Sequence, residues 1–269
     1  MKLLRFLLCL VLTEFAWVAH GQDGNRLFYD AVRTEAAGDL DDAITYYEKA
    51  ASQAHSANLH GNLANLYLKT GNHGKAILHY RKALLLAPNN RELRANLTQA
   101  REIAGLPVRK ATVDDSYFAP TTIGVWCWGV VILFWAGLWG NLFFLRALLP
   151  FYLKAVVMSS WAILVAFGAY ATWRTDNNIQ LLAREAVAVA SDTSNGEEPS
   201  SIRLRRFAGD ANDANAELKP GEIVHIDVGE DSTLKEHETP DGTIWYLARS
   251  RYGGKKGWAT TKELIRILD

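Results

Sequence analysis

Two long stretches without a single charged side chain constrain this chain more than any other feature. Residues 121–145 and 155–173 contain no Asp, Glu, Lys, Arg or His. Each stretch has about the 20 residues that a helix needs to cross the hydrocarbon core of a membrane. The connection over residues 146–154 is too short for a domain. The sequence therefore predicts a transmembrane helical hairpin over residues 121–173, with a buried pair of soluble helices as the alternative.

The charges beside these stretches predict an orientation. The connection carries Arg146 and Lys154 and no acidic residue, whereas positive and negative charges balance on the outer flanks of both stretches. Positive loops face the cytoplasm, so we expect the 146–154 loop inside the cell and the polar parts outside the cytoplasm. Because no Asp, Glu, Lys, Arg or His lies within either span, we expect the hairpin to anchor the chain and not to conduct ions or protons.

The N-terminus predicts export independently. Lys2 and Arg5 precede an apolar core over residues 6–12, and Ala19 and Gly21 mark a small-residue cleavage site. This order predicts a signal peptide over residues 1–21. Glu14 leaves an uncleaved signal anchor as the alternative. Either version predicts a multi-pass protein of the cytoplasmic (inner) membrane with its polar domains on the outer side.

An internal repeat lies between the N-terminus and the first apolar stretch. The segments GDLDDAITYYEKA (38–50) and GNHGKAILHYRKA (71–83) superimpose with an offset of 33 residues, which aligns Tyr47 with Tyr80. The pattern of small and aromatic residues resembles the tetratricopeptide repeat, and Gly38 and Gly71 suit the turn between paired helices. The resemblance implies two repeats and a capping helix over residues 22–112. Two repeats fall below the roughly three that are usually needed for stability, so we expect support from a partner, a second copy or the membrane.

Such repeats bind peptides on the face formed by the first helix of each pair. Carboxamides donate and accept hydrogen bonds, which suits a peptide backbone, and a lysine suits a carboxylate. Asn62 can equally be part of the repeat consensus, with a structural role. The predicted peptide-binding groove consists of Asn58, Asn62, Asn65, Lys69, Asn96 and Gln99.

The last ninety residues have a different pattern. From residue 181 short alternating segments are separated by turns rich in Gly, Pro and Asp, which is typical of a small β-barrel. The segments KPGEIV, WYLA and KGWA resemble the bacterial SH3-like domain, and that resemblance implies that Trp258 packs the barrel over residues 181–269. Trp245 and Tyr252 are candidates for a ligand surface, although packing is the favoured role. Residues 191–201 are predicted to be a flexible insertion.

The composition and motifs do not favour nucleic-acid binding or catalysis. Lys plus Arg and Asp plus Glu are equal at 29 each, so no overall basic charge favours nucleic acid. The two cysteines lie in apolar runs and predict no disulfide and no cysteine-based zinc site. His55 and His60, and likewise His73 and His79, lack the spacing of four residues that places two ligands on one helical face. We expect no catalytic residues, no cofactor and no metal.

The order of the parts is more specific than any part alone. A signal peptide, an all-α tetratricopeptide array, a two-helix transmembrane hairpin and a C-terminal all-β SH3-like barrel make a multidomain membrane protein similar to the BatE-type proteins of bacterial aerotolerance operons. The resemblance implies an envelope complex with von Willebrand factor A-type membrane proteins and a MoxR-type ATPase. It favours a scaffold that binds protein or peptide partners. The alternative is an anchoring module whose barrel binds peptidoglycan stem peptides.

Overall fold

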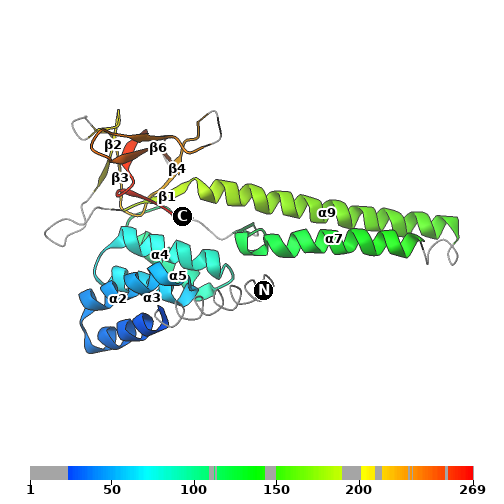
Figure 1. Cartoon of the computed structure of the whole chain (residues 1–269), viewed down its shortest axis with the longest axis horizontal. Coiled ribbons are helices and arrows are strands. Elements are labelled where there is room, and N and C mark those ends of the chain that lie inside the picture. Colours follow the sequence, from blue (N-terminus) through cyan, green and yellow to red (C-terminus); the bar gives the residue numbers. More distant parts are fainter. Residues whose placement is uncertain are drawn as a thin grey trace, which may run out of the picture. The chain divides into compact units, whose positions relative to one another are not determined.

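The computed structural model describes residues 24–108, 112, 114–142, 150–189, 201–209, 214–229, 231, 233–251 and 254–268. The chain divides into two compact units, one made of Met1–Arg109 with Arg184–Asp269 and the other of Lys110–Ala183. Figure 1 shows the elements of both units. The predicted signal peptide, Arg146 in the connection, most of the 191–201 insertion and Tyr252 lie outside the described residues.

Five helices form the N-terminal part of the first unit. Residues 24–37 are helical, and α2 (Leu40–Gln53), α3 (Ala57–Lys69), α4 (His73–Leu86) and α5 (Arg91–Ile103) follow. Side chains accept backbone N–H groups at three helix starts, at Asp39 for α2, Asn72 for α4 and Asn90 for α5, which satisfies donors that the helix itself leaves unpaired. Gly38 and Gly71 have φ of 89° and 79°. These helices and turn glycines confirm the predicted helical repeats.

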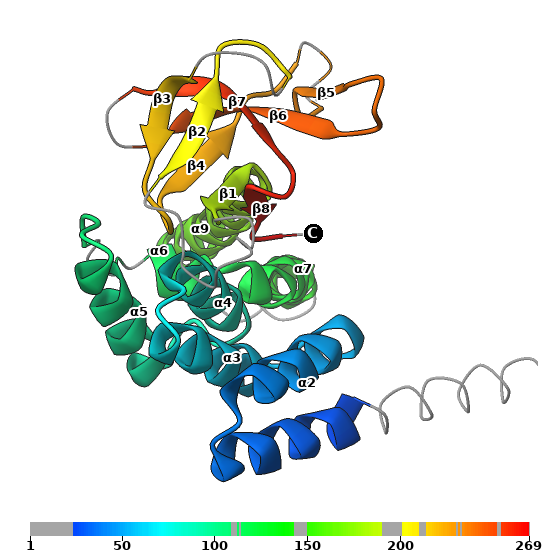
Figure 2. The same cartoon turned by 90° about the vertical axis from the view of Figure 1, so that its left-hand side faces the viewer.

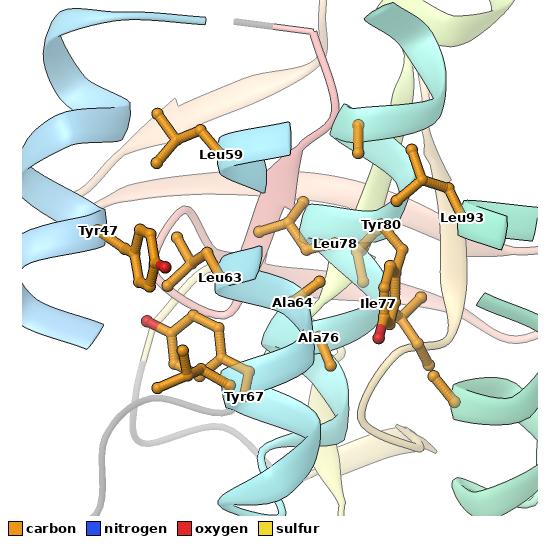
Figure 3. Packing of buried hydrophobic residues seen from close by; sticks show 14 of the residues in the cluster. Tyr47, Leu59, Leu63, Ala64, Tyr67, Ala76, Ile77, Leu78, Tyr80 and Leu93 are labelled. Atoms are coloured by element: carbon orange, nitrogen blue, oxygen red, sulfur yellow. The ribbon is translucent and has the colours of Figure 1, made fainter. Parts of the chain in front are cut away.

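The repeated positions form the core of this helical part. The small residues that the two repeats share, Ala43, Ala76, Ala50 and Ala83, are fully buried. Figure 3 shows Tyr47 beside Leu63 and Tyr67, and Tyr80 beside Ile77 and Leu78. Small residues let the helices approach closely, and the aromatic rings fill the space between pairs. The residues that the two repeats share are therefore the ones that pack the helices together.

The apolar residues of the capping helix α5 do not all face the core. Leu93 is buried and Leu97 packs against the core, but Ile103 is 53% exposed. Six residues separate Ile103 from Leu97, and a helix returns to the same face after three or four residues. Ala100 takes the inward position instead.

Eight short strands follow in the same unit. They are β1 (Glu185–Ala188), β2 (Ile202–Arg205), β3 (Ala214–Leu218), β4 (Ile223–Ile226), β5 (Glu236–Glu238), β6 (Ile244–Ser250), β7 (Lys256–Thr260) and β8 (Leu264–Arg266). The antiparallel sheet runs in the order β3-β2-β7-β6-β4-β1-β8, and β5 pairs with β6 (Figure 2). Among the described residues β3 and β8 stay at opposite ends of this order. The strands confirm an all-β region, but the sheet is not closed and a barrel is not confirmed.

The two tryptophans of the sheet have different surroundings. Trp245 is 1% exposed, its indole donates to Thr239 Oγ1 at 3.2 Å, and the Arg205 guanidinium lies 4.8 Å from its ring centroid. This burial agrees with the packing role expected for Trp245. Trp258 is only half-buried and lies outside the clusters of buried residues, because Gly257 and Ala259 take the inward positions of β7. The prediction that Trp258 packs the interior of a barrel is therefore wrong.

The second unit is a helical hairpin. A short helix α6 (Asp114–Tyr117) and a 3₁₀ turn η1 (Pro120–Thr122) lead into α7 (Ile123–Gly140), and α9 (Phe151–Ala183) returns. The Trp161 indole donates to the Leu133 carbonyl at 2.8 Å, and a Cβ at Gly137 would overlap that indole. Two helices of this unit, Pro120–Gly140 and Phe151–Ala183, are long and apolar enough to cross a membrane, by length and composition alone.

The helices and the sheet of the first unit share one cluster of buried residues. Val187, Val189 and Ile267 from the sheet region join the core of the helical repeats. The sheet region therefore packs directly against the helical repeats.

Candidate interaction surface of the repeat domain

The six candidate residues lie on two helices, α3 and α5. On α3 the intervals of four, three and four residues from Asn58 through Asn62 and Asn65 to Lys69 place all four on one helical face. Asn96 and Gln99 lie on α5 at the same kind of interval. We call these six residues the carboxamide face. Asn58, Lys69 and Gln99 are exposed, while the other three are half-buried.

A first hydrogen-bond network joins α3 to the two preceding helices. Asn62 Nδ2 donates to the Tyr47 hydroxyl at 3.4 Å, and that hydroxyl donates to Glu35 Oε2 at 3.2 Å. Lys69 Nζ lies 2.8 Å from Glu35 Oε1. The carboxylate of a partner would therefore compete with Glu35 for Lys69.

A second network joins α3 to α4 and α5. The Tyr80 hydroxyl donates to Asn65 Oδ1 at 2.5 Å, and Asn96 Nδ2 donates to the same oxygen at 3.4 Å. Tyr47 and Tyr80 are equivalent in the repeat, and each meets an asparagine of α3. Asn62 and Asn65 thus hold neighbouring helices together.

Burial shapes the acid–base behaviour of the two tyrosines. Burial raises the pKa of Tyr80 to about 12. The pKa of Tyr47 is also raised to about 12, first by burial and then by the charge of Glu35. Both hydroxyls therefore stay protonated and act as hydrogen-bond donors throughout the physiological range.

Exposed apolar side chains lie next to the carboxamide face, and the sequence analysis missed them. Tyr29 and Val32 precede Asn62 and Asn65 by one repeat of 33 residues, and they are 71% and 40% exposed. Ile103 follows Gln99 by four residues on α5 and is also exposed. Subtracting the repeat period from the positions of Asn62 and Asn65 would have found the first two. Polar residues in the middle with apolar residues at both ends can bind a segment of mixed character.

A histidine pair lies inside the second repeat, with His60 buried and His79 half-buried. His60 Nδ1 and His79 Nδ1 are 3.2 Å apart, and their ring centroids are 5.3 Å apart. The nitrogens therefore point at each other, so one donates and the other accepts a hydrogen bond, and their lone pairs do not converge on a common metal position. Among the described residues no group of three His, Cys, Asp or Glu side chains could hold a metal ion. Burial, and secondarily the charges of His60 and nearby lysines, lowers the pKa of His79 to about 3.

The charged side chains of the sheet are largely paired with each other. Asp227 lies 2.7 Å from Lys256 Nζ and 3.6 Å from an Arg249 nitrogen. Glu263 accepts from Arg205 at 3.0 Å. The half-buried Trp258 ring lies 6.2 Å from the exposed His237 ring in an edge-on arrangement. This aromatic pair is the surface feature of the sheet that suits a ligand best.

The helical part has the architecture of a protein that binds other proteins through stacked helix pairs. Residues 57–90 match the tetratricopeptide repeat family. A comparison with curated proteins finds no match to the chain. The chain therefore contains a tetratricopeptide repeat, which is a protein–protein interaction module and typically has no catalytic role. Two apolar helices give weak evidence for association with a membrane.

Proposed function

We propose that this chain is a membrane-anchored scaffold of a bacterial envelope complex, and that the carboxamide face and its apolar neighbours bind a partner segment. The observation that carries the proposal is the row of exposed groups beside a recognised repeat. The exposed groups come from three helices. They are Tyr29 on the helix over residues 24–37, Asn58 on α3, and Gln99 and Ile103 on the capping helix α5. These positions are where a helical repeat presents its binding residues.

The surface also defines the chemistry of the partner. Lys69 is already paired with Glu35, and the carboxamides of Asn62 and Asn65 already bond to tyrosines. Recognition then depends on the exposed amides and on apolar contacts near the two ends of the face. A partner segment with apolar side chains and an accessible backbone fits this surface better than a strongly acidic tail.

The resemblance to BatE-type proteins suggests the candidates for the partner. We propose von Willebrand factor A-type membrane proteins of the same operon, in a complex with a MoxR-type ATPase. The proposed hairpin of α7 and α9 anchors the chain in the cytoplasmic membrane, and its 146–154 connection faces the cytoplasm. The repeats and the sheet then work outside the cytoplasm.

Binding by the full chain tests the proposed surface. The chain in nanodiscs is immobilised, and the soluble part of a von Willebrand factor A-type partner is titrated over it. Replacing Tyr29 by Ala should raise Kd by about tenfold or more, because an aromatic side chain that a partner buries contributes about 2 kcal/mol or more. Phe207 is 63% exposed in the sheet region, and Phe207→Ala is the matched control. Equal Kd values for the two variants would contradict the proposed surface.

The orientation needs its own test. Single cysteines at Ser56, Ala147 and Ser194, in a Cys127→Ala background, are labelled in intact cells with a membrane-impermeant maleimide. Labelling at positions 56 and 194 but not at 147 supports the proposed topology. The reverse pattern would place the repeats and the sheet in the cytoplasm.

The sheet supports a second candidate function. In the alternative, an SH3-like sheet binds peptidoglycan stem peptides and anchors the chain to the cell wall, and the half-exposed Trp258 beside His237 is the observation in its favour. Sedimentation of the full chain with purified cell wall tests it. Loss of sedimentation in Trp258→Ala, with Tyr29→Ala unchanged, would support this second function.

A further inference from the structure

The outer face of α4 is in contact with the sheet. α4 is the repeat helix that packs against β1 (Figure 2). Ile77 of α4 is fully buried, and a Cβ at Gly221, in the turn between β3 and β4, would overlap its Cδ1. The same Cβ would lie 3.1 Å from the Cδ1 of Leu106, which follows α5. The turn of the sheet therefore fits closely against the end of the repeat array.

A buried carboxylate forms ion pairs at the contact between α4 and the sheet. Glu185, the first residue of β1, is 4% exposed. It accepts from Arg81 of α4 and, at 2.9 Å, from Arg251, which follows β6. One arginine comes from the repeats and the other from the sheet region. A buried carboxylate that lost either partner would keep much of its desolvation cost.

A third contact satisfies the end of the capping helix. Lys219 Nζ donates to the Gly105 carbonyl at 3.2 Å. Carbonyls at the C-terminal end of a helix have no partner within the helix and attract positive charge. The turn over residues 219–222 thus provides both a close apolar fit and a cation for the last helix.

We propose that the sheet is the structural cap of the tetratricopeptide array, in the place that a further repeat would occupy. Two repeats with one capping helix are a short array, and stacked helix pairs gain stability from each neighbour that covers an open face. The sheet covers the outer face of α4 and the end of α5 with apolar, ionic and helix-capping contacts. The sheet therefore stabilises α4 and α5, and it is an integral part of the surface-bearing unit.

This inference goes beyond partner binding, because it concerns what keeps the repeats folded. It predicts a reciprocal dependence. A defect confined to the sheet side of the contact should open α4 and α5, and a defect confined to α4 should open β1 and β8.

Two turn glycines provide a matched test in the full chain. Gly221 and Gly242 have φ of 82° and 79°, so an alanine strains the backbone equally at both. A Cβ at Gly242 has no neighbour within 4 Å among the described residues, whereas a Cβ at Gly221 meets the repeats. Hydrogen exchange followed by mass spectrometry on the full chain in detergent micelles measures the opening of each element. Gly221→Ala should lower protection in α4 and α5 by about tenfold or more, since the added Cβ overpacks the contact with Ile77. Gly242→Ala should lower protection only near β5 and β6.

A compensating double variant separates the loss of this contact from general misfolding of the chain. Ile77→Val removes the Cδ1 methyl that a Cβ at Gly221 would overlap. The double variant Gly221→Ala with Ile77→Val should regain protection in α4 and α5 relative to Gly221→Ala alone. Ile77→Val alone should lower protection in β1 and β8 by a few-fold, while Ile44→Val on α2, away from the sheet, should not.

The contrary results are distinct. If Gly221→Ala and Gly242→Ala leave α4 and α5 equally protected, the sheet does not stabilise the repeats and the proposal is wrong. If the double variant shows no recovery, the effect of Gly221→Ala is backbone strain alone and the contact with Ile77 carries no weight. Neither readout involves a partner, so failure here is separate from failure of the proposed binding surface.

Discussion

The His60–His79 pair should make the repeat domain sensitive to acid. The ordinary pKa of histidine is 6.5, and burial lowers the pKa of His79 to about 3 in the folded chain. Below pH 6.5 the unfolded chain therefore binds a proton at this position that the folded chain does not. Stability is unaffected above that pH and is lost progressively as pH falls from about 6.5 to about 3.

The size of the effect follows from the linkage relation. Each pH unit within this window removes about 1.4 kcal/mol from the free energy of unfolding. At pH 5 the expected loss from His79 is about 2 kcal/mol, which corresponds to a roughly 30-fold rise in the population of the open state. A second proton on the pair would also replace the Nδ1 hydrogen bond with two opposed donors.

Hydrogen exchange of α3 and α4 in the full chain at pH 7 and pH 5 measures this loss, after correction for the intrinsic exchange rate. His79→Gln provides the test variant, because its amide can still donate to or accept from His60 but does not titrate. His237→Gln is the control, because His237 is exposed and lies on β5, outside the repeats. The loss at pH 5 should shrink in His79→Gln and stay the same in His237→Gln. An equal loss in all three proteins would refute the assignment to His79.

Other perturbations probe the remaining contacts. Glu185→Gln leaves Arg81 and Arg251 facing an uncharged amide, so it should lower the free energy of unfolding by about 3 kcal/mol or more. Chemical denaturation measures this loss, and an unchanged midpoint would show that the three charges are not buried together. Asn72→Ala should destabilise α4 by about 1 kcal/mol, whereas Ser56→Ala should have a smaller effect because Ser56 makes no side-chain cap. Gly137→Ala forces the Trp161 indole away from α7, so it should change the tryptophan emission of the hairpin, and an unaltered spectrum would contradict the close fit.

The repeat was predictable because it depends on local spacing. Helix pairs with small residues at fixed positions pack with their neighbours in the chain, so the offset of 33 residues identified Ala43 and Ala76 as core positions. The strands were also visible as alternating segments. The sequence did not predict on which face of the sheet Trp258 lies, because an alternating pattern does not say which of the two faces is covered.

Contacts between segments that are far apart in the chain could not be predicted from the sequence. Arg81 and Glu185 are 104 residues apart, and neither residue type nor spacing connects them. The histidine pair was missed for a different reason. The spacing of four residues applies to two ligands on one helix, whereas His60 and His79 come from adjacent helices and are 19 residues apart. Pairing positions across the two helices of one repeat would have brought them together.

The carboxamide face has a packing role and a proposed binding role, and the sequence could not separate the two. Asn62 and Asn65 sit on the expected helical face, yet their hydrogen bonds go to Tyr47 and Tyr80, so replacing them would weaken the packing between helices as well as any partner contact. A loss of binding in such variants would therefore not identify a binding site. Exposed positions such as Tyr29 separate the two roles, because truncating an exposed side chain changes the surface and leaves the helix contacts in place. In the proposed surface, selectivity comes from the exposed amides and the apolar ends. The half-buried asparagines fix the angle between helices, which sets the distance between those ends.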